Sequence, residues 1–185
     1  MKTIWIAALA VVANTAAAED WTGGHAGLRL DYADIEIEPT GGDGASNAGD
    51  GALLGVVGGY RYDLGAYVIG GTLSYVQGDV AVPSLGDAMT PADPTVDAIL
   101  RAGIEVGYDA GPYLLYGTLG SARLDATSIF GDSADETGTF FGVGADYLMS
   151  DKVILGAELI RTDVDDFAGA DFSVTNLAVS ARYRF

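Results

Sequence analysis

The last ten residues, 176–185, read Asn-Leu-Ala-Val-Ser-Ala-Arg-Tyr-Arg-Phe and alternate between two kinds of side chain. One face of this stretch is apolar and consists of Leu177, Val179, Ala181, Tyr183 and Phe185. The other face is small, polar or basic and consists of Asn176, Ala178, Ser180, Arg182 and Arg184. Successive side chains of a strand point to opposite sides, so a period of two predicts a β-strand with one apolar face.

The same alternation recurs in seven earlier segments of the chain. They cover residues 25–32, 52–62, 66–76, 94–108, 113–124, 139–148 and 153–161. Within 113–124 the faces are hard to tell apart because Leu114 and Leu115 fall on opposite sides, and there we assign Arg123 to the inner face. The sequence therefore predicts an all-β fold of eight strands.

Short and long connections alternate between these strands. The short, turn-like ones are 63–65, 109–112 and 150–152. The longer ones are rich in Gly, Asp, Ser, Pro or Ala and cover 34–51, 77–94, 125–137 and 163–171. This pattern is typical of an antiparallel up-and-down transmembrane barrel, whose long loops lie outside the cell. An even number of strands also returns both termini to the periplasmic side.

The chemistry of the two faces indicates which one points outward. A soluble barrel of lipocalin type also alternates, but with its apolar residues inside and its charges outside. Here the charged face is sparse and rich in glycine, and tyrosines lie at the ends of the apolar face, as in an aromatic girdle at lipid headgroups. We therefore expect the apolar face to contact lipid, with the soluble barrel as the alternative. The chain has no cysteine, which excludes disulfides and Cys-based metal or redox sites.

The first 18 residues have the order of a secretory signal peptide. Met1-Lys2-Thr3 gives a short positive start, residues 4–12 are apolar, and 16–18 are three alanines. A membrane-anchor helix is the alternative, but it needs roughly 18 or more apolar residues. We therefore predict cleavage after Ala18 and a single mature barrel domain, residues 19–185.

Several segments resemble small outer-membrane barrels of proteobacteria, the porin family that includes the OmpX, OmpA-barrel and opacity-protein group. Gly-Gly-Tyr-Arg-Tyr at 58–62 and Gly-Val-Gly-Ala-Asp-Tyr at 142–147 are similar to strands of this group. The ending Ala-Arg-Tyr-Arg-Phe at 181–185 looks like its C-terminal assembly signal. The resemblance covers the whole mature chain and implies an eight-stranded barrel in a Gram-negative outer membrane, contact with lipid and lipopolysaccharide, and recognition by the barrel-assembly machinery. The implied signal residues are Leu177, Val179, Ala181, Tyr183 and Phe185.

The inner face carries a nearly balanced set of charges. An eight-stranded barrel is just wide enough for side chains to fill it, and a buried charge without a partner is costly. We therefore expect an ionic, hydrogen-bonded interior that fixes the strand register. A narrow proton or ion path along Arg61, Arg101 and Glu105 is the alternative. The predicted interior network consists of Arg29, Asp31, Arg61, Asp97, Arg101, Glu105, Asp146, Glu158, Arg182 and Arg184.

The acidic residues gather in the predicted long connections. These hold 16 of the 26 acids and no Lys or Arg, and the net charge of −17 argues against nucleic acid as a partner. Asp163, Asp165 and Asp166 could bind Ca²⁺ or Mg²⁺ weakly. They lack the Gly and Glu spacing of a calcium loop, so a solvated acidic loop is the simpler interpretation. Arg161, at the end of its strand, could equally meet a lipid phosphate or be a rim charge.

The sequence contains no recognisable catalytic constellation. His25 is the only histidine, and nothing marks it as part of a triad with Ser180 or Asp31. The glycine pairs precede no predicted helix and are therefore not phosphate cradles. We expect a non-enzymatic outer-membrane protein without a cofactor, in a structural or surface-interaction role. A narrow pore for ions or small solutes, or an enzyme that modifies lipid A, is the alternative.

Overall fold

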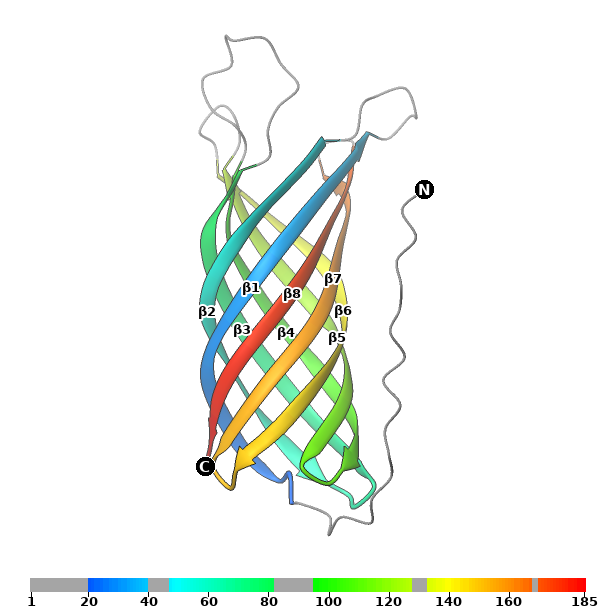
Figure 1. Ribbon diagram of the computed structural model, residues 1–185. Helices are drawn as coiled ribbons and strands as arrows, with labels where there is room; N and C mark the ends of the chain where they lie inside the picture. The colour runs from blue at the N-terminus through cyan, green and yellow to red at the C-terminus, as the bar shows by residue number, and fades with distance from the viewer. Residues whose placement is uncertain (1–19, 40–46, 82–94, 128–132, 168–169) are drawn as a thin grey trace, which may run out of the picture.

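The computed structural model describes residues 20–39, 47–81, 95–127, 133–167 and 170–185, which form eight strands. The strands close into a barrel in which each is antiparallel to both neighbours (Figure 1). Their bounds are β1 (Gly23–Pro39), β2 (Asn47–Asp63), β3 (Tyr67–Ala81), β4 (Thr95–Ala110), β5 (Tyr113–Thr127), β6 (Ser133–Ser150), β7 (Val153–Phe167) and β8 (Ala170–Arg184). The predicted fold class and strand number are confirmed. In this described part of the chain, no helix is long and apolar enough to cross a membrane.

The register of the strands fixes the shape of the barrel. Following directly paired residues from His25 around all eight strands returns to β1 at Ile35, ten residues further along. A stagger of this size tilts the strands by about 40° from the barrel axis. Each residue therefore advances about 2.5 Å along that axis. The interior of such a barrel is just wide enough for side chains to fill.

The two ends of the barrel are built differently. At the turn end, β1 begins, β8 ends, and short turns join the remaining strands in pairs (Figure 1). Gly65 and Gly111 have positive φ angles of 98° and 75°, which side chains disfavour. Asp63 and Asp109 each accept a hydrogen bond from the backbone N–H of the glycine two residues later, which stabilises these turns. At the opposite loop end, the strands are joined by 40–46, 82–94, 128–132 and 168–169, which lie outside the described residues.

The apolar face of the strands points outward. Leu28 is 64% exposed and Leu177 is 56% exposed, whereas Leu53 and Val174 on the inner face are fully buried. Charged residues such as Arg101 lie inside. This arrangement is the reverse of a soluble barrel, which holds its apolar residues within and its charges at the surface. The lipocalin-like alternative therefore does not fit the structure.

The strands extend further toward the loop end than the alternation predicted. β1 continues to Pro39 and β2 begins at Asn47, so most of the predicted 34–51 loop is strand. The long connection predicted at 163–171 is wrong, because β7 ends at Phe167 and β8 begins at Ala170. The hydrophobic period marks only the part of a strand that has an apolar face. Backbone pairing continues beyond it, through residues as polar as Glu36.

The ambiguous strand β5 turns its even-numbered residues inward. Leu114 is fully buried inside, whereas Leu115 is exposed on the outer wall. Arg123 is exposed on the same outer wall, so its assignment to the inner face was wrong. The register explains the choice, because directly paired residues share a face and Arg123 pairs with the outward Leu100 of β4.

Candidate functional site

Eight charged side chains, four arginines and four acids, fill the middle of the barrel in two groups. In the first ionic cluster (Arg29, Asp31, Arg101 and Glu158), Arg29 Nε lies 2.5 Å from Asp31 Oδ1 and Arg29 Nη1 lies 2.9 Å from Glu158 Oε2. Arg101 Nη1 donates to Asp31 Oδ2 at 3.3 Å, and Arg101 Nη2 donates to Asn176 Oδ1 at 2.8 Å. Asp31 therefore holds two arginines from different strands.

The second ionic cluster consists of Arg61, Glu105, Asp146 and Arg182. Arg61 donates to both carboxylate oxygens of Glu105, from Nε at 2.6 Å and from Nη2 at 2.9 Å. Its Nη2 also lies 2.6 Å from Asp146 Oδ2, and Arg182 Nη2 donates to Asp146 Oδ1. A Cβ atom at Gly156 would lie 2.4 Å from Asp146 Oδ1, so this glycine leaves the room that the ion pair occupies. Bidentate, charge-assisted pairs of this kind are the strong class of hydrogen bond.

A small polar cavity of about 10 Å³ lies between the two clusters. Arg29 and Glu158 of the first cluster and Glu105 and Arg182 of the second line it, together with Tyr116. That volume is about the size needed for a single water molecule with several polar partners. The two clusters therefore meet around a polar cavity large enough for one water molecule.

The ionic clusters lie between two apolar layers, one toward each end of the barrel. The loop-end layer consists of Ala33, Leu53, Val76, Ile99, Ala122, Leu124, Phe140, Ile160 and Val174, all buried. The turn-end layer consists of Trp21, Val68, Leu114, Tyr116, Leu148 and Ile154. The Arg61 guanidinium lies over the rings of Trp21, at 5.6 Å, and Tyr116, at 5.4 Å, so cation–π contacts join this layer to the second cluster. The ionic clusters are thus enclosed by apolar side chains toward both ends.

Eight of the ten residues predicted for the interior network lie in these two clusters. Arg184 does not: it lies at the turn-end rim, where it donates to the backbone carbonyls of Asp151, at 3.0 Å, and Asp20. Its assignment to the interior was wrong, because Arg184 is the last residue of β8. The Asp97 backbone lies at a β-bulge between Val96 and Ala98, and its side chain lies outside the described residues.

Sequence reasoning missed several polar and aromatic members of the interior. Asn176 accepts from Arg101, and Thr118 Oγ1 donates to Glu158 Oε1 at 2.8 Å. Asn176 was visible on the inner face of the last strand, but its arginine partner comes from a strand 75 residues away. Trp21 was missed because it precedes β1 and lies outside the alternating segments. It is held by its backbone N–H, which donates to Asp63 Oδ2 at 3.0 Å, and by its indole N–H, which donates to the Gly111 carbonyl at 3.3 Å.

The part of the chain that the structure describes contains no group of three His, Cys, Asp or Glu residues that could hold a metal ion. Asp163, one of three aspartates considered for cation binding, pairs instead with Arg161 Nε at 2.8 Å. The side chains of Asp165 and Asp166 lie outside the described residues.

At the turn end, before β1 begins, the backbone N–H of Thr22 donates a hydrogen bond to the Asp20 carboxylate and lowers the pKa of Asp20.

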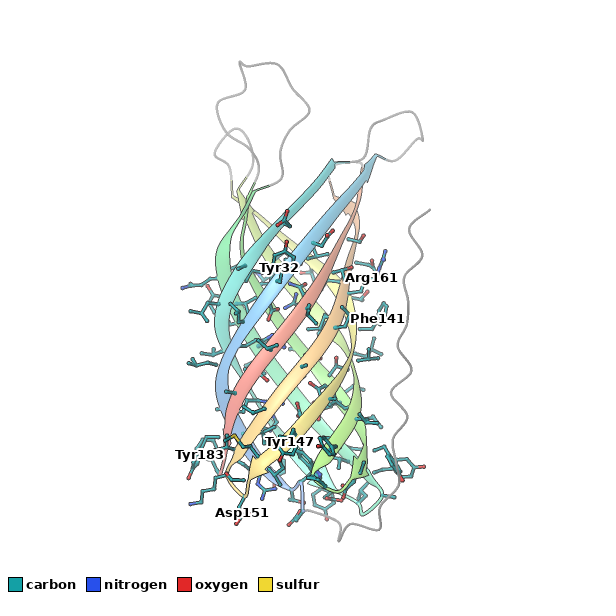
Figure 2. All side chains as sticks on the ribbon, viewed as in Figure 1. Tyr32, Phe141, Tyr147, Asp151, Arg161 and Tyr183 are labelled. Carbon is teal, nitrogen blue, oxygen red and sulfur yellow. The ribbon has the colours of Figure 1, made fainter. Side chains whose placement is uncertain are left out.

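The outer wall carries a ring of aromatic side chains near the turn end. Its exposed members are Tyr60, Tyr62, Tyr67, Tyr108, Tyr113, Tyr147, Tyr183 and Phe185. Pairs within the ring are in contact, and Tyr113 is stacked on Tyr147 at 5.1 Å between ring centroids. Figure 2 shows Tyr147 and Tyr183 at this end of the barrel. From Tyr108 to Leu100 on β4, eight residues of apolar outer wall rise about 20 Å.

The last residues of the chain close the barrel at the turn end. β8 pairs with β1 along its whole length, with Tyr183 opposite Ala26 and Leu177 opposite Tyr32. The backbone N–H of Phe185 donates to the Gly24 carbonyl at 2.9 Å, and its ring packs edge-on against Tyr183 at 5.4 Å. The five apolar residues predicted as an assembly signal therefore lie on the outer wall beside the closing seam.

Residues 3–185 match the family model described as the outer membrane protein beta-barrel domain. The chain belongs to this outer-membrane β-barrel family. Its fold resembles that of Ail, the attachment invasion locus protein of Yersinia pestis, solved in complex with the heparin analogue sucrose octasulfate. That match has 20% identity over 88% of this chain and 99% of Ail, with a TM-score of 0.55. Neisserial surface protein A is similar at 16% identity over 89% and 98% of the two chains, with a TM-score of 0.54. A comparison with curated proteins found no match.

Because the chain belongs to the outer-membrane β-barrel family, we can state what surrounds the outer and inner faces of its wall. The strands of such a protein cross the membrane, and a closed barrel leaves no backbone edge unpaired in the hydrocarbon. The exposed apolar wall of this family member therefore contacts acyl chains, and its aromatic ring lies at the level of lipid headgroups. The ionic clusters lie inside the wall, shielded from lipid by the backbone.

Proposed function

We propose that this outer-membrane barrel is a non-conducting, non-enzymatic protein with a structural or surface-interaction role. The observation that carries the proposal is the layered interior, in which two ionic clusters lie between two apolar layers. An ion crossing either apolar layer would lose its hydration without gaining a partner, which is costly. The surfaces available for interaction with other molecules are then the outer wall and the loop end.

Conductance in a planar lipid bilayer tests this proposal against the narrow pore. The alternative path along Arg61, Arg101 and Glu105 needs ions to pass between the two clusters, but these arginines already bind acids at 2.6 to 3.3 Å. We expect purified protein to give the same baseline current as protein boiled before addition. Reproducible channel steps from the folded protein alone would overturn the proposal.

We further propose that the loop end is extracellular and that both termini are periplasmic. Short turns on one side and the aromatic ring at the same end support this orientation. Because the chain has no cysteine, single substitutions give unique labels. Asp43→Cys, in the connection 40–46, should react with a membrane-impermeant maleimide on intact cells. Asp151→Cys, in an exposed turn, should react only after lysis, and the reverse pattern would contradict the orientation.

The C-terminal residues are proposed to act in assembly, and residues 1–18 as the cleaved signal peptide. Phe185 is 79% exposed, so its ring adds little to the packing of the finished barrel. Phe185→Ser should therefore lower the yield of barrel in the outer membrane by impairing recognition by the assembly machinery. Leu64→Ser, at an exposed turn of the same end, is the matched control and should assemble normally. Equal yields would refute the assembly role, and an intact N-terminus by mass spectrometry would refute cleavage.

A lipid A-modifying enzyme is the remaining alternative, and the structure offers it little support. The only histidine, His25, is buried inside the barrel at 4% exposure, away from the lipid-facing wall. Lipid A mass spectra from cells with and without the protein should be identical, and a protein-dependent mass change would establish an activity. We also expect no polysulfated ligand of the kind bound to Ail, because the segments 34–51, 77–94, 125–137 and 163–171 together hold 16 acids and no base. Divalent cations are the partners that such acids favour.

A further inference from the structure

A short N-terminal segment, residues 20–22, closes the turn end of the barrel although it belongs to no strand. Its tryptophan, Trp21, is 1% exposed and is part of the buried turn-end layer. The other described members of this layer all lie on strands of the barrel wall, namely Val68, Leu114, Tyr116, Leu148 and Ile154. Among these described residues, Trp21 alone can leave the layer without breaking a strand ladder.

Hydrogen bonds tie this segment to three separate parts of the turn end. The Trp21 backbone N–H donates to Asp63 Oδ2 at 3.0 Å, and the Asp63 backbone N–H donates to Thr22 Oγ1 at 3.1 Å. The Trp21 indole N–H donates to the Gly111 carbonyl at 3.3 Å, in the turn between β4 and β5. Arg184, at the end of β8, donates to the backbone carbonyl of the segment's first residue. Of these bonds only the indole bond is fully buried, so water can replace the others at little cost.

Two glycines, Gly23 and Gly24, join the segment to the barrel at the start of β1. Gly23 has a φ angle of 141°, a backbone conformation that side chains rarely adopt. Hinges are a few residues at the end of an element that absorb changes in φ and ψ, and small residues are common there. The segment can therefore pivot about these glycines while β1 stays paired with β2 and β8.

The interior next to this segment contains polar atoms that the closed barrel leaves unsatisfied. Among the described residues at this end, three buried atoms have no hydrogen-bond partner: His25 Nε2, Arg61 Nη1 and Asp109 Oδ2. A buried polar group without a partner is unfavourable, and water would satisfy it. Moving Trp21 out would thus lose apolar burial but gain hydration of these atoms. The open state is therefore closer in free energy to the closed state than the burial of Trp21 alone would suggest.

We propose that residues 20–22 form a hinged latch that controls the access of water to the second ionic cluster through the turn end. When the latch is closed, Trp21 covers Arg61, whose guanidinium lies 5.6 Å from the centre of the tryptophan ring. When it is open, water reaches Arg61 and the carboxylates that Arg61 binds. The loop-end layer stays in place, so the barrel is closed to ions in both states. The latch therefore goes beyond the proposed non-conducting role and holds for either orientation in the membrane.

Cysteine accessibility in lipid nanodiscs tests the latch from both ends of the barrel. The chain has no cysteine, so a single substitution gives a unique label. Val68→Cys reports on the turn-end layer, and Val76→Cys, equally buried in the loop-end layer, is the matched control. Each is combined with Trp21 or with Trp21→Ala and is reacted with a small, water-soluble methanethiosulfonate. Heat modifiability on gels confirms that each variant is folded.

We expect Trp21→Ala to raise the rate of labelling at Val68→Cys by about tenfold or more, because local opening sets the rate at a buried site. The rate at Val76→Cys should stay as slow as it is with Trp21 present. An unchanged rate at Val68→Cys would overturn the latch. An equal rise at both sites would also overturn it, because the substitution would then have loosened the whole barrel.

Hydrogen exchange of the unaltered protein tests whether the latch opens by itself. NMR spectra in nanodiscs resolve the Trp21 indole N–H, and the loss of its signal in Trp21→Phe assigns it. After correction for intrinsic rates, we expect this N–H to exchange at least about tenfold faster than the backbone N–H of Ile99, which lies within the strand ladder of β4. Equal protection of the two groups would show that Trp21 leaves only when the barrel unfolds, and the latch would then be refuted. Neither outcome bears on conductance, which the loop-end layer blocks.

Discussion

The ionic clusters and the loop-end layer occupy the same inner face of the same strands but are held together by different forces. Arg101 of the first cluster and Ile99 of the loop-end layer are only two residues apart on β4, and both are buried. Arg101 needs particular partners, Asp31 and Asn176, in a particular geometry. Ile99 needs only apolar neighbours of the right volume. The ionic clusters therefore require particular side chains from non-adjacent strands to meet inside the barrel, whereas the apolar layers need only fill the space on either side of them.

Removing one acid should give the largest loss of stability. Asp146→Ala leaves Arg61 and Arg182 without their shared carboxylate, and breaking a buried pair in this way costs about 3–5 kcal/mol. Urea unfolding in lipid vesicles measures the change. Asp151→Ala, in an exposed turn, is the control and should leave the midpoint unchanged. A loss below about 1 kcal/mol for Asp146→Ala would mean that the clusters are not held by their ion pairs.

A new charge on the outer wall should be costly only in the middle of the belt. Ile104→Arg places a guanidinium near mid-belt and should cost about 2–4 kcal/mol. Leu100→Arg, four residues along the same strand, lies at the loop-end boundary beside Arg123 and should cost about 1 kcal/mol or less. The same unfolding measurement compares them. If the two substitutions cost the same, the apolar belt does not end at the level of Arg123.

Coupling between residues should be strong within a cluster and absent between clusters. A double-mutant cycle on Arg61→Met and Glu105→Gln, which share two hydrogen bonds, should give an interaction energy of about 1–3 kcal/mol. The cycle that pairs Arg61→Met with Asp31→Asn crosses between clusters and should give less than about 0.5 kcal/mol. Comparable values in both cycles would show that the interior is one network and not two.

A conservative change in the loop-end layer should have the smallest effect. Ile99→Val removes one buried methylene and should cost about 0.5–1.5 kcal/mol, with no loss of assembly. Val106→Ala is the comparison. It removes side-chain volume from the exposed outer wall of the same strand, where the side chain faces lipid and not the interior. Misfolding or loss of barrel in Ile99→Val would show that the apolar layer, too, specifies the register.

Particular residues show how far the sequence could predict the site. Arg29, Arg61, Arg101 and Arg182 were assignable to the interior because each alternates with apolar neighbours on its own strand. Arg123 was not, because two adjacent leucines on β5 make both faces look apolar, and only pairing with β4 and β6 decides between them. The apolar layers were not predicted either. Leu53 and Ile99 lie on the inner face of the pattern, but nothing local shows that inner-face residues from eight strands meet at one height.

The sequence by itself determined the class of the protein: an outer-membrane barrel of eight strands, apolar outside and charged within. It could do so because side-chain direction along a strand is a local property with a period of two. The tertiary structure decided everything that depends on stagger, since a register step of ten residues around the barrel sets which side chains share a height. That stagger sorts the charges into two balanced clusters and separates them from the apolar layers.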